Sequence, residues 1–371
     1  MADEWSGHVA AEYRYFSETA LTAEQHDSYL SVATQSEWFH DWDGGRQSFT
    51  FVPFYRYDQH DDERTHADIR ELTWLKAAAD WELRIGVRKV FWGVTESQHL
   101  VDIINQTDLV ENIDGEDKLG QPMVNLALIR DWGTLDLFVL PYFRERTFPG
   151  EQGRLRTVPV VNTDNALYQS DKEEKHIDYA LRWQRSMGEW DAGLSHFYGT
   201  SRDPQFIPGP LLTPFYELIH QTGLDVQATF DAWLWKLEAI RRRGPDETYT
   251  AATWGLEYTF YGVMESAADI CLVLEYLYDE RGQQASTPFQ DDVMVGLRFT
   301  LNDEASSEAL IGVIDDLDSD AQMLNVEASR RFGNNWKLNL EARWFNNIPV
   351  TDPLYSFSND DYIQLELAYY F

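Results

Sequence analysis

The chain ends in Asp361-Tyr-Ile-Gln-Leu-Glu-Leu-Ala-Tyr-Tyr-Phe371, and this stretch decides the fold. From Ile363 to Phe371 every second side chain is apolar, whereas the residues between them include Gln364 and Glu366. A period of two is typical of a β-strand, because successive side chains point to opposite faces. A length of about ten residues suits a strand that crosses a bilayer with one face in lipid and the other in water. The stretch therefore predicts a membrane-crossing strand.

The same alternation recurs along the whole chain in segments of about ten to thirteen residues. One of the clearest is the strand predicted over 81–92, where Leu83 and Ile85 lie on one face and Glu82 and Arg84 on the other. A repeated pattern of this kind predicts an all-β chain whose strands each have one apolar face.

Short turns alternate with longer connections along the chain, which is typical of a transmembrane antiparallel up-and-down β-barrel. The alternating segments number about eighteen, an even number as bacterial single-chain barrels require. Segments 28–40 and 66–77 alternate poorly, so a count of about sixteen stays open. No linker of biased composition divides the sequence, and we expect a single barrel domain over 1–371.

The terminal Phe371, the rhythm of hairpins and the aromatic residues at the ends of apolar strands resemble Gram-negative outer-membrane β-barrel porins along almost the full length. The resemblance is to the architectural class and implies a channel in the bacterial outer membrane, in contact with outer-membrane lipid and lipopolysaccharide. The sequence begins Met1-Ala-Asp-Glu-Trp5 without a signal peptide, and we expect that an export signal was removed.

Composition excludes several other classes of function. The formal net charge of −33 argues against nucleic acid as a partner, which needs a basic surface. A single cysteine, Cys271, leaves no disulfide within the chain and no cysteine motif for zinc or haem. We expect no cofactor and no metal. The acidic runs 58–64 and 315–320 indicate soluble loops, with divalent-cation bridging to lipid phosphates as the alternative.

The connection 93–120 is the third external loop and is predicted to fold into the lumen. Leu100, Val101 and Ile104 could share one face of a helix packed against the inner wall. Its position and character resemble the third loop that narrows porins. The residues expected to form the constriction are His99, Asp102, Asn105, Asp108 and Glu111. A short helix over the outer mouth is the alternative, and 146–173 is predicted to be a long external loop.

Charged residues at inward positions follow from the alternation and are predicted to line the pore, either selecting solutes or bracing the wall. They are Glu12, Arg14, Arg56, Glu82, Arg84, Arg88, Asp136, Asp178, Arg182, Lys236, Glu238, Glu257, Glu275, Arg298, Glu327, Glu341, Arg343 and Glu366. Arg84 and Arg88 precede the predicted constriction, where a basic rung would attract a carboxylate or phosphate.

These features predict a channel for passive diffusion of small hydrophilic or amphiphilic solutes. An export conduit for a polymer or lipid and a barrel platform for a partner protein are alternatives, and a homo-oligomer stays open. Catalysis is not expected, because His40 and His196 are isolated in ordinary strand patterns. Residues 112–117 open like a calcium loop but lack the glutamate at its twelfth position, where Met123 stands, which favours a simple turn.

Overall fold

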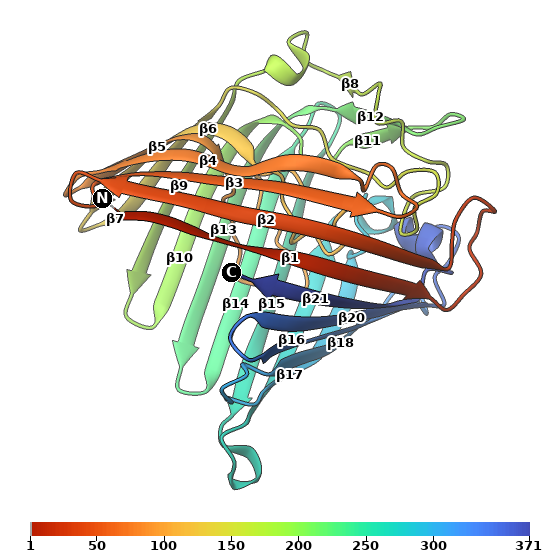
Figure 1. Cartoon of the computed structure of the whole chain (residues 1–371). Coiled ribbons are helices and arrows are strands. Elements are labelled where there is room, and N and C mark those ends of the chain that lie inside the picture. Colours follow the sequence, from red (N-terminus) through yellow and green to blue (C-terminus); the bar gives the residue numbers. More distant parts are fainter. Residues whose placement is uncertain (1) are drawn as a thin grey trace.

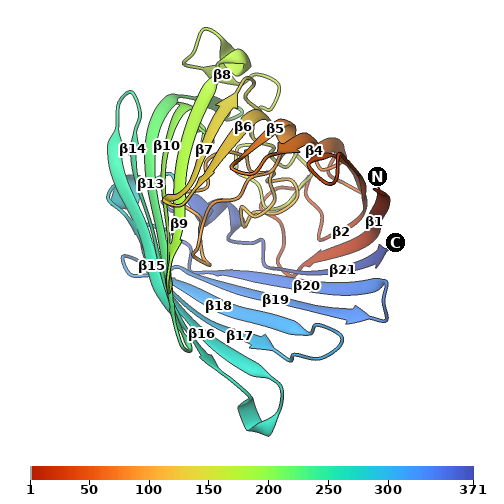
Figure 2. The same cartoon turned by 90° about the vertical axis from the view of Figure 1, so that its left-hand side faces the viewer.

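The computed structural model describes residues 2–371 and forms a closed barrel of antiparallel strands in chain order (Figures 1 and 2). The eighteen barrel strands are β1 (Ala2–Phe16), β2 (Ser28–Trp42), β3 (Gln47–Asp58), β4 (His66–Ala77), β5 (Trp81–Arg88), β6 (Gln121–Arg130), β7 (Gly133–Leu140), β9 (Asp178–Met187), β10 (Trp190–Thr200), β13 (Leu218–Phe230), β14 (Trp233–Arg243), β15 (Thr248–Phe260), β16 (Asp269–Asp279), β17 (Asp291–Thr300), β18 (Glu308–Asp316), β19 (Gln322–Phe332), β20 (Trp336–Asn346) and β21 (Tyr362–Tyr370).

Within residues 2–371, three short strands and four short 3-10 helices lie in the connections. The strands β8 (Leu167–Tyr168), β11 (Gln205–Ile207) and β12 (Thr213–Tyr216) form a separate small sheet. The helical turns are η1 (Glu173–Lys175), η2 (Val263–Glu265), η3 (Gly282–Gln284) and η4 (Pro353–Phe357). Among residues 2–371, no helix is long and apolar enough to cross a membrane.

Closure of the barrel joins the first strand to the last. β1 pairs with β21, and the backbone N–H of Phe371 donates to the carbonyl of Gly7 over 3.0 Å. The all-β up-and-down barrel is thereby confirmed with eighteen strands. Segments 28–40 and 66–77, whose alternation is poor, are β2 and β4, so the alternative of sixteen strands is wrong.

The two faces of the wall differ as the alternation predicts. On β21, Leu365 and Leu367 point outward, each with 42% of its surface exposed, whereas Ala368 between the outward positions is 1% exposed. Exposed leucine side chains around the outside of a closed barrel give it the apolar band that a bilayer requires.

The two rims of the barrel are unequal. The short turns, the start of β1 and the end of β21 lie at one rim, the turn rim, and most of the long connections lie at the other, the loop rim (Figure 1). The segment 146–173, predicted to be external, has two parts. β8 and η1 lie outside the ring, whereas Arg154 turns back into the mouth and pairs with Asp360 over 2.6 Å.

The strand predicted over 81–92 ends at Arg88 instead. Gly86 has φ +140°, and a Cβ there would lie 1.9 Å from the carbonyl oxygen of Leu72, so this close approach of two strands requires glycine. After Arg88 the chain leaves the wall, and Trp92 is buried inside the barrel among other apolar side chains.

Candidate pore and its inner loop

Residues 93–120, here called the inner loop, lie inside the ring of strands. Figure 2 shows the segment that follows β5 within the lumen. The helix predicted around Leu100, Val101 and Ile104 is absent from the described chain, and turns and bends replace it. The apolar side chains still pack on the inner wall, where Val101 and Ile104 are fully buried.

Side-chain hydrogen bonds explain why no helix forms there. Asn105 accepts from the backbone N–H of Val90 over 2.8 Å and donates to the carbonyls of Arg88 and Leu119. Asp102 accepts from the backbone N–H of Trp92 over 3.3 Å. Short polar side chains of this kind compete with helical bonds for the backbone groups.

Two carboxylates on the β14–β16 wall hold the start of the inner loop. Glu238 on β14 accepts from the backbone N–H groups of Val94, Thr95 and Val101 over 2.7, 3.0 and 3.2 Å. Glu275 on β16 accepts from the N–H groups that follow, at residues 96 and 97. Buried backbone donors need such partners, so these contacts fix the path of the loop.

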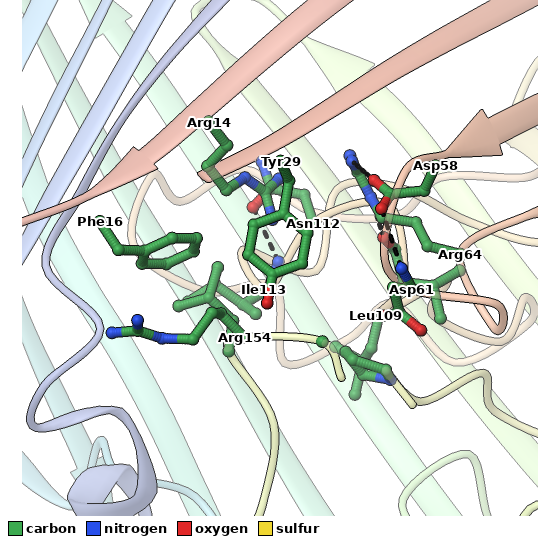
Figure 3. A pocket seen from close by; sticks show the side chains of 14 residues that line it. Arg14, Phe16, Tyr29, Asp58, Asp61, Arg64, Leu109, Asn112, Ile113 and Arg154 are labelled. Carbon is green, nitrogen blue, oxygen red and sulfur yellow. Dashed lines mark hydrogen bonds and ion pairs between the residues drawn. The ribbon is translucent and has the colours of Figure 1, made fainter. Parts of the chain in front are cut away.

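The opposite wall holds the far part of the inner loop through a buried ion-pair cluster. Glu111 lies 2.7 Å from Arg56 on β3, and Arg56 also lies 3.0 Å from Glu12 on β1. Arg64 joins the same cluster, 2.8 Å from Glu12. Figure 3 shows the neighbouring packing, in which Arg64 lies beside Asp58.

A third group of contacts ties the inner loop to β17 and β20. Glu96 lies 2.5 Å from Arg298, and Asp114 lies 3.0 Å from Arg343. With the two anchors described above, the loop is attached to strands on several sides of the barrel. It therefore crosses the lumen and divides it.

The main open space lies between the inner loop and the wall from β14 to β20. It is a cavity of about 1010 Å³ that begins among residues of the loop rim such as Phe206 and Phe289. A second cavity of about 410 Å³ continues toward the turn rim. The two share five lining residues, here called the neck: Glu96, Asp114, Arg298, Leu310 and Glu327. A further recess of about 560 Å³ adjoins the first at residues 93, 94 and 227.

The residues predicted to line the pore have different places in this arrangement. Lys236, Glu257, Arg298 and Arg343 line the large cavity, Glu341 and Glu366 line the one toward the turn rim, and Arg182 lines the recess. Arg56, Asp178 and Glu238 are buried in contacts with loops.

The structure does not bring Arg84 and Arg88 to the neck. Arg84 pairs with Glu82 on its own strand, and Arg88 donates to the side chain of Asn125 over 2.9 Å. Neither residue lines the cavities beside the inner loop. The charges at the neck come from β17, β19 and the loop itself.

The residues predicted to form the constriction mostly anchor the loop instead of lining its free surface. Asp102 lies 3.1 Å from Lys118, and Asp108 lies 2.6 Å from Arg70 on β4. Of the five, His99 lines the large cavity. No pattern in the sequence points to the loop's neck residues, Glu96 and Asp114, because the loop follows no regular alternation.

Three side chains meet in a cluster that the sequence did not suggest. His66, Asp108 and Glu111 offer ligand atoms that all lie within 4.8 Å of one another, as in a metal site. Arg70 and Arg56 already neutralise the two carboxylates at 2.6 and 2.7 Å. The guanidinium groups oppose a divalent cation, so we assign these residues to the ion-pair network.

The calcium-like stretch 112–117 forms turns. Asn112 accepts from the backbone N–H of Ile113 and donates to Glu341 over 2.9 Å, and Asp114 accepts from the N–H of Glu116. These side chains are occupied in local bonds and in the pair with Arg343. The simple turn favoured by the sequence fits these contacts.

His99 lies between two carboxylates, 2.6 Å from Glu116 and 3.7 Å from Glu238. Burial lowers the pKa of His99, but the hydrogen bond with Glu116 and the negative charges of both carboxylates outweigh this and raise the pKa from 6.5 to about 10. The pairing therefore stabilises the inner loop fully below pH 6.5 and is lost as the pH rises through about 10.

We expect His99 to stay protonated at pH 8, where an unperturbed histidine is neutral. The measurement is a pH titration of the ¹⁵N-labelled imidazole by NMR in detergent. The Glu116→Gln variant is the control and should titrate at lower pH. Deprotonation of His99 near its ordinary pKa in the unaltered protein would contradict the ion-pair assignment.

Comparisons with known proteins agree with this architecture. No protein-family model matches the sequence, and no curated protein matches it either. The structure is similar to that of a BenF-like porin from Pseudomonas fluorescens Pf-5, with a TM-score of 0.60 over 100% of this chain and 97% of that one. The sequences are 9% identical.

The chain has the porin fold. A mutant of the Rh. blastica porin also matches over the full length of both chains, with a TM-score of 0.48 and 12% identity. At 9% identity, the likeness to the BenF-like porin establishes the fold of the barrel alone.

Proposed function

We propose that this barrel is a channel in a bacterial outer membrane through which small solutes diffuse passively. The single observation that carries the proposal is the pair of cavities that meet at the neck. Together they run from the loop rim past the inner loop toward the turn rim. A barrel of this width holds water unless its loops fill it. The inner loop leaves the side along β14 to β20 open.

The export conduit and the protein platform receive less support. A conduit for a charged polymer would favour a lining of one sign, whereas Lys236 and Arg298 line the cavity beside Glu257. The mixture of charges near the neck suits selection among small solutes. We further propose that the whole of 1–371 acts as one barrel domain, with outer-membrane lipid and lipopolysaccharide around it.

Planar-bilayer recording with the purified protein is expected to show discrete current steps. Leu310→Trp places an indole in the neck and should reduce each step by about half or more, since the neck sets the conductance. Ile311→Trp is the matched control, because the next residue of β18 points to lipid and is 42% exposed. A correctly folded barrel that gives no steps would overturn the proposal.

A further inference from the structure

We propose that the neck and the wall above it select small organic cations that carry an apolar group. The inference rests on the proposed channel and names the class of solute that the channel takes. Two independent features of the wall from β17 to β19 support it. One is an uncharged hollow surface in the large cavity, and the other is the excess of carboxylates at the neck.

The uncharged surface begins with a row of apolar side chains across three neighbouring strands. Met294 on β17 pairs with Ile314 on β18, and Ile314 pairs with Met323 on β19. All three line the large cavity. Met294 and Ile314 are 5% and 8% exposed and pack with Met323 and Phe289, so together they form an apolar edge of the cavity. Such a surface favours a solute with a hydrocarbon part.

The next row toward the turn rim is hollow. Gly296 and Gly312 pair directly across β17 and β18. A Cβ at either glycine would lie 2.9 or 3.0 Å from the Cε atom of Met294, so the methionine tip covers the glycine pair. A thioether side chain is flexible and can move to let an apolar group rest in the hollow.

The following row is the wall side of the neck, and its charge is negative overall. The neck contains Glu96, Asp114 and Glu327 against one cation, Arg298. Three carboxylates and one guanidinium give a formal charge of −2, and Arg343, 3.0 Å from Asp114, reduces the excess to one carboxylate. Glu327 is the least compensated, since its side chain is 46% exposed and lies 4.0 Å from Arg343.

The lining of the cavity toward the turn rim is also negatively charged overall. Beyond the residues of the neck, its lining adds Glu308, Glu341 and Glu366 against Lys337. Three carboxylates and one ammonium again give −2. Rings of carboxylates favour cations in channels, so a cation meets a favourable potential from the neck to the turn rim.

The register places the two features next to each other. Leu310 pairs with Glu327 across β18 and β19. An ammonium group bound at Glu327 would therefore place its hydrocarbon part over Leu310 and the glycine hollow. A carboxylate with the same hydrocarbon part would meet Glu327 with like charge.

Block of the potassium current through single channels tests this selection with three probes. Cyclohexylammonium is cationic and apolar, ethanolammonium is cationic and polar, and cyclohexanecarboxylate is anionic and apolar. We expect cyclohexylammonium to block at the lowest concentration. Glu327→Gln should weaken its block about threefold, as expected for a partly exposed ion pair. Ile314→Ser should weaken it about fourfold, equivalent to one buried methylene group.

Glu265→Gln, at the exposed hairpin tip of the turn rim, is the matched control for the change in charge and should leave the block unchanged. Equal block by cyclohexanecarboxylate would overturn the preference for cations, and equal block by ethanolammonium would overturn the apolar surface. Neither result would contradict the proposed channel function. A barrel that gives no current would contradict the channel function. Saturation-transfer NMR of the same probes with the barrel in lipid nanodiscs would then test the binding preference separately.

Discussion

Replacing residues 95–118 by a short glycine-serine linker is expected to raise the single-channel conductance about threefold or more. The inner loop is attached to walls on several sides of the lumen, and a barrel of about eighteen strands without such a loop encloses an aqueous channel. The linker can close without strain, because Arg88 at the end of β5 pairs with Gln121 at the start of β6. Planar-bilayer recording gives the result directly.

The deletion also removes partners from buried charges such as Arg56, so folding is verified first by the far-UV circular dichroism of the purified barrel. A second variant, Asp114→Ala with Glu96→Ala, keeps the loop and widens the neck. It should raise the conductance less than the deletion does. A deletion that folds and conducts no better than the intact protein would show that the inner loop does not limit the current.

The Glu238→Ala variant is expected to release the start of the inner loop from the wall. Three backbone N–H groups lose their acceptor, and each unsatisfied buried donor costs about 1–3 kcal/mol. A total of about 3 kcal/mol raises the population of the released loop by roughly a hundredfold. Limited trypsin digestion measures this, because Lys118 can be cleaved only when the inner loop leaves the lumen.

Glu82→Ala is the control for that experiment, since Glu82 lies on β5 and pairs with Arg84 on its own strand. Its rate of cleavage at Lys118 should match that of the unaltered protein. A Glu238→Ala barrel cleaved no faster than this control would mean that the remaining anchors, such as Glu275 and Arg56, hold the loop without Glu238.

The sequence predicts the wall of this barrel well because a strand has only two faces. From Ile363 to Tyr369 the outward apolar residues of β21 are exposed, and the residues between them are half-buried or buried. The same rule points Glu327 and Glu341 inward, where they line the cavity toward the turn rim. The local sequence pattern is enough to predict which way a side chain points wherever the neighbouring strand has the same geometry.

The inner loop follows no such rule. Its path depends on Glu238 and Glu275, which lie more than a hundred residues away in the sequence and accept from its backbone. A helical pattern at Leu100 and Ile104 is therefore a poor guide, because long-range acceptors and Asn105 take the backbone donors. The neck depends on the same long-range contacts, so the alternation singles out Arg84 and Arg88 and does not point to Glu96 and Asp114.

The pairing of β1 with β21 has a consequence for biogenesis. The barrel cannot close until β21 has been synthesised, because Phe371 forms backbone hydrogen bonds with Gly7. A chain truncated before β21 would present two rows of unpaired backbone groups to hydrocarbon, each costing several kcal/mol. We expect closure of the barrel to be all-or-none, so that products without β21 stay open and are degraded.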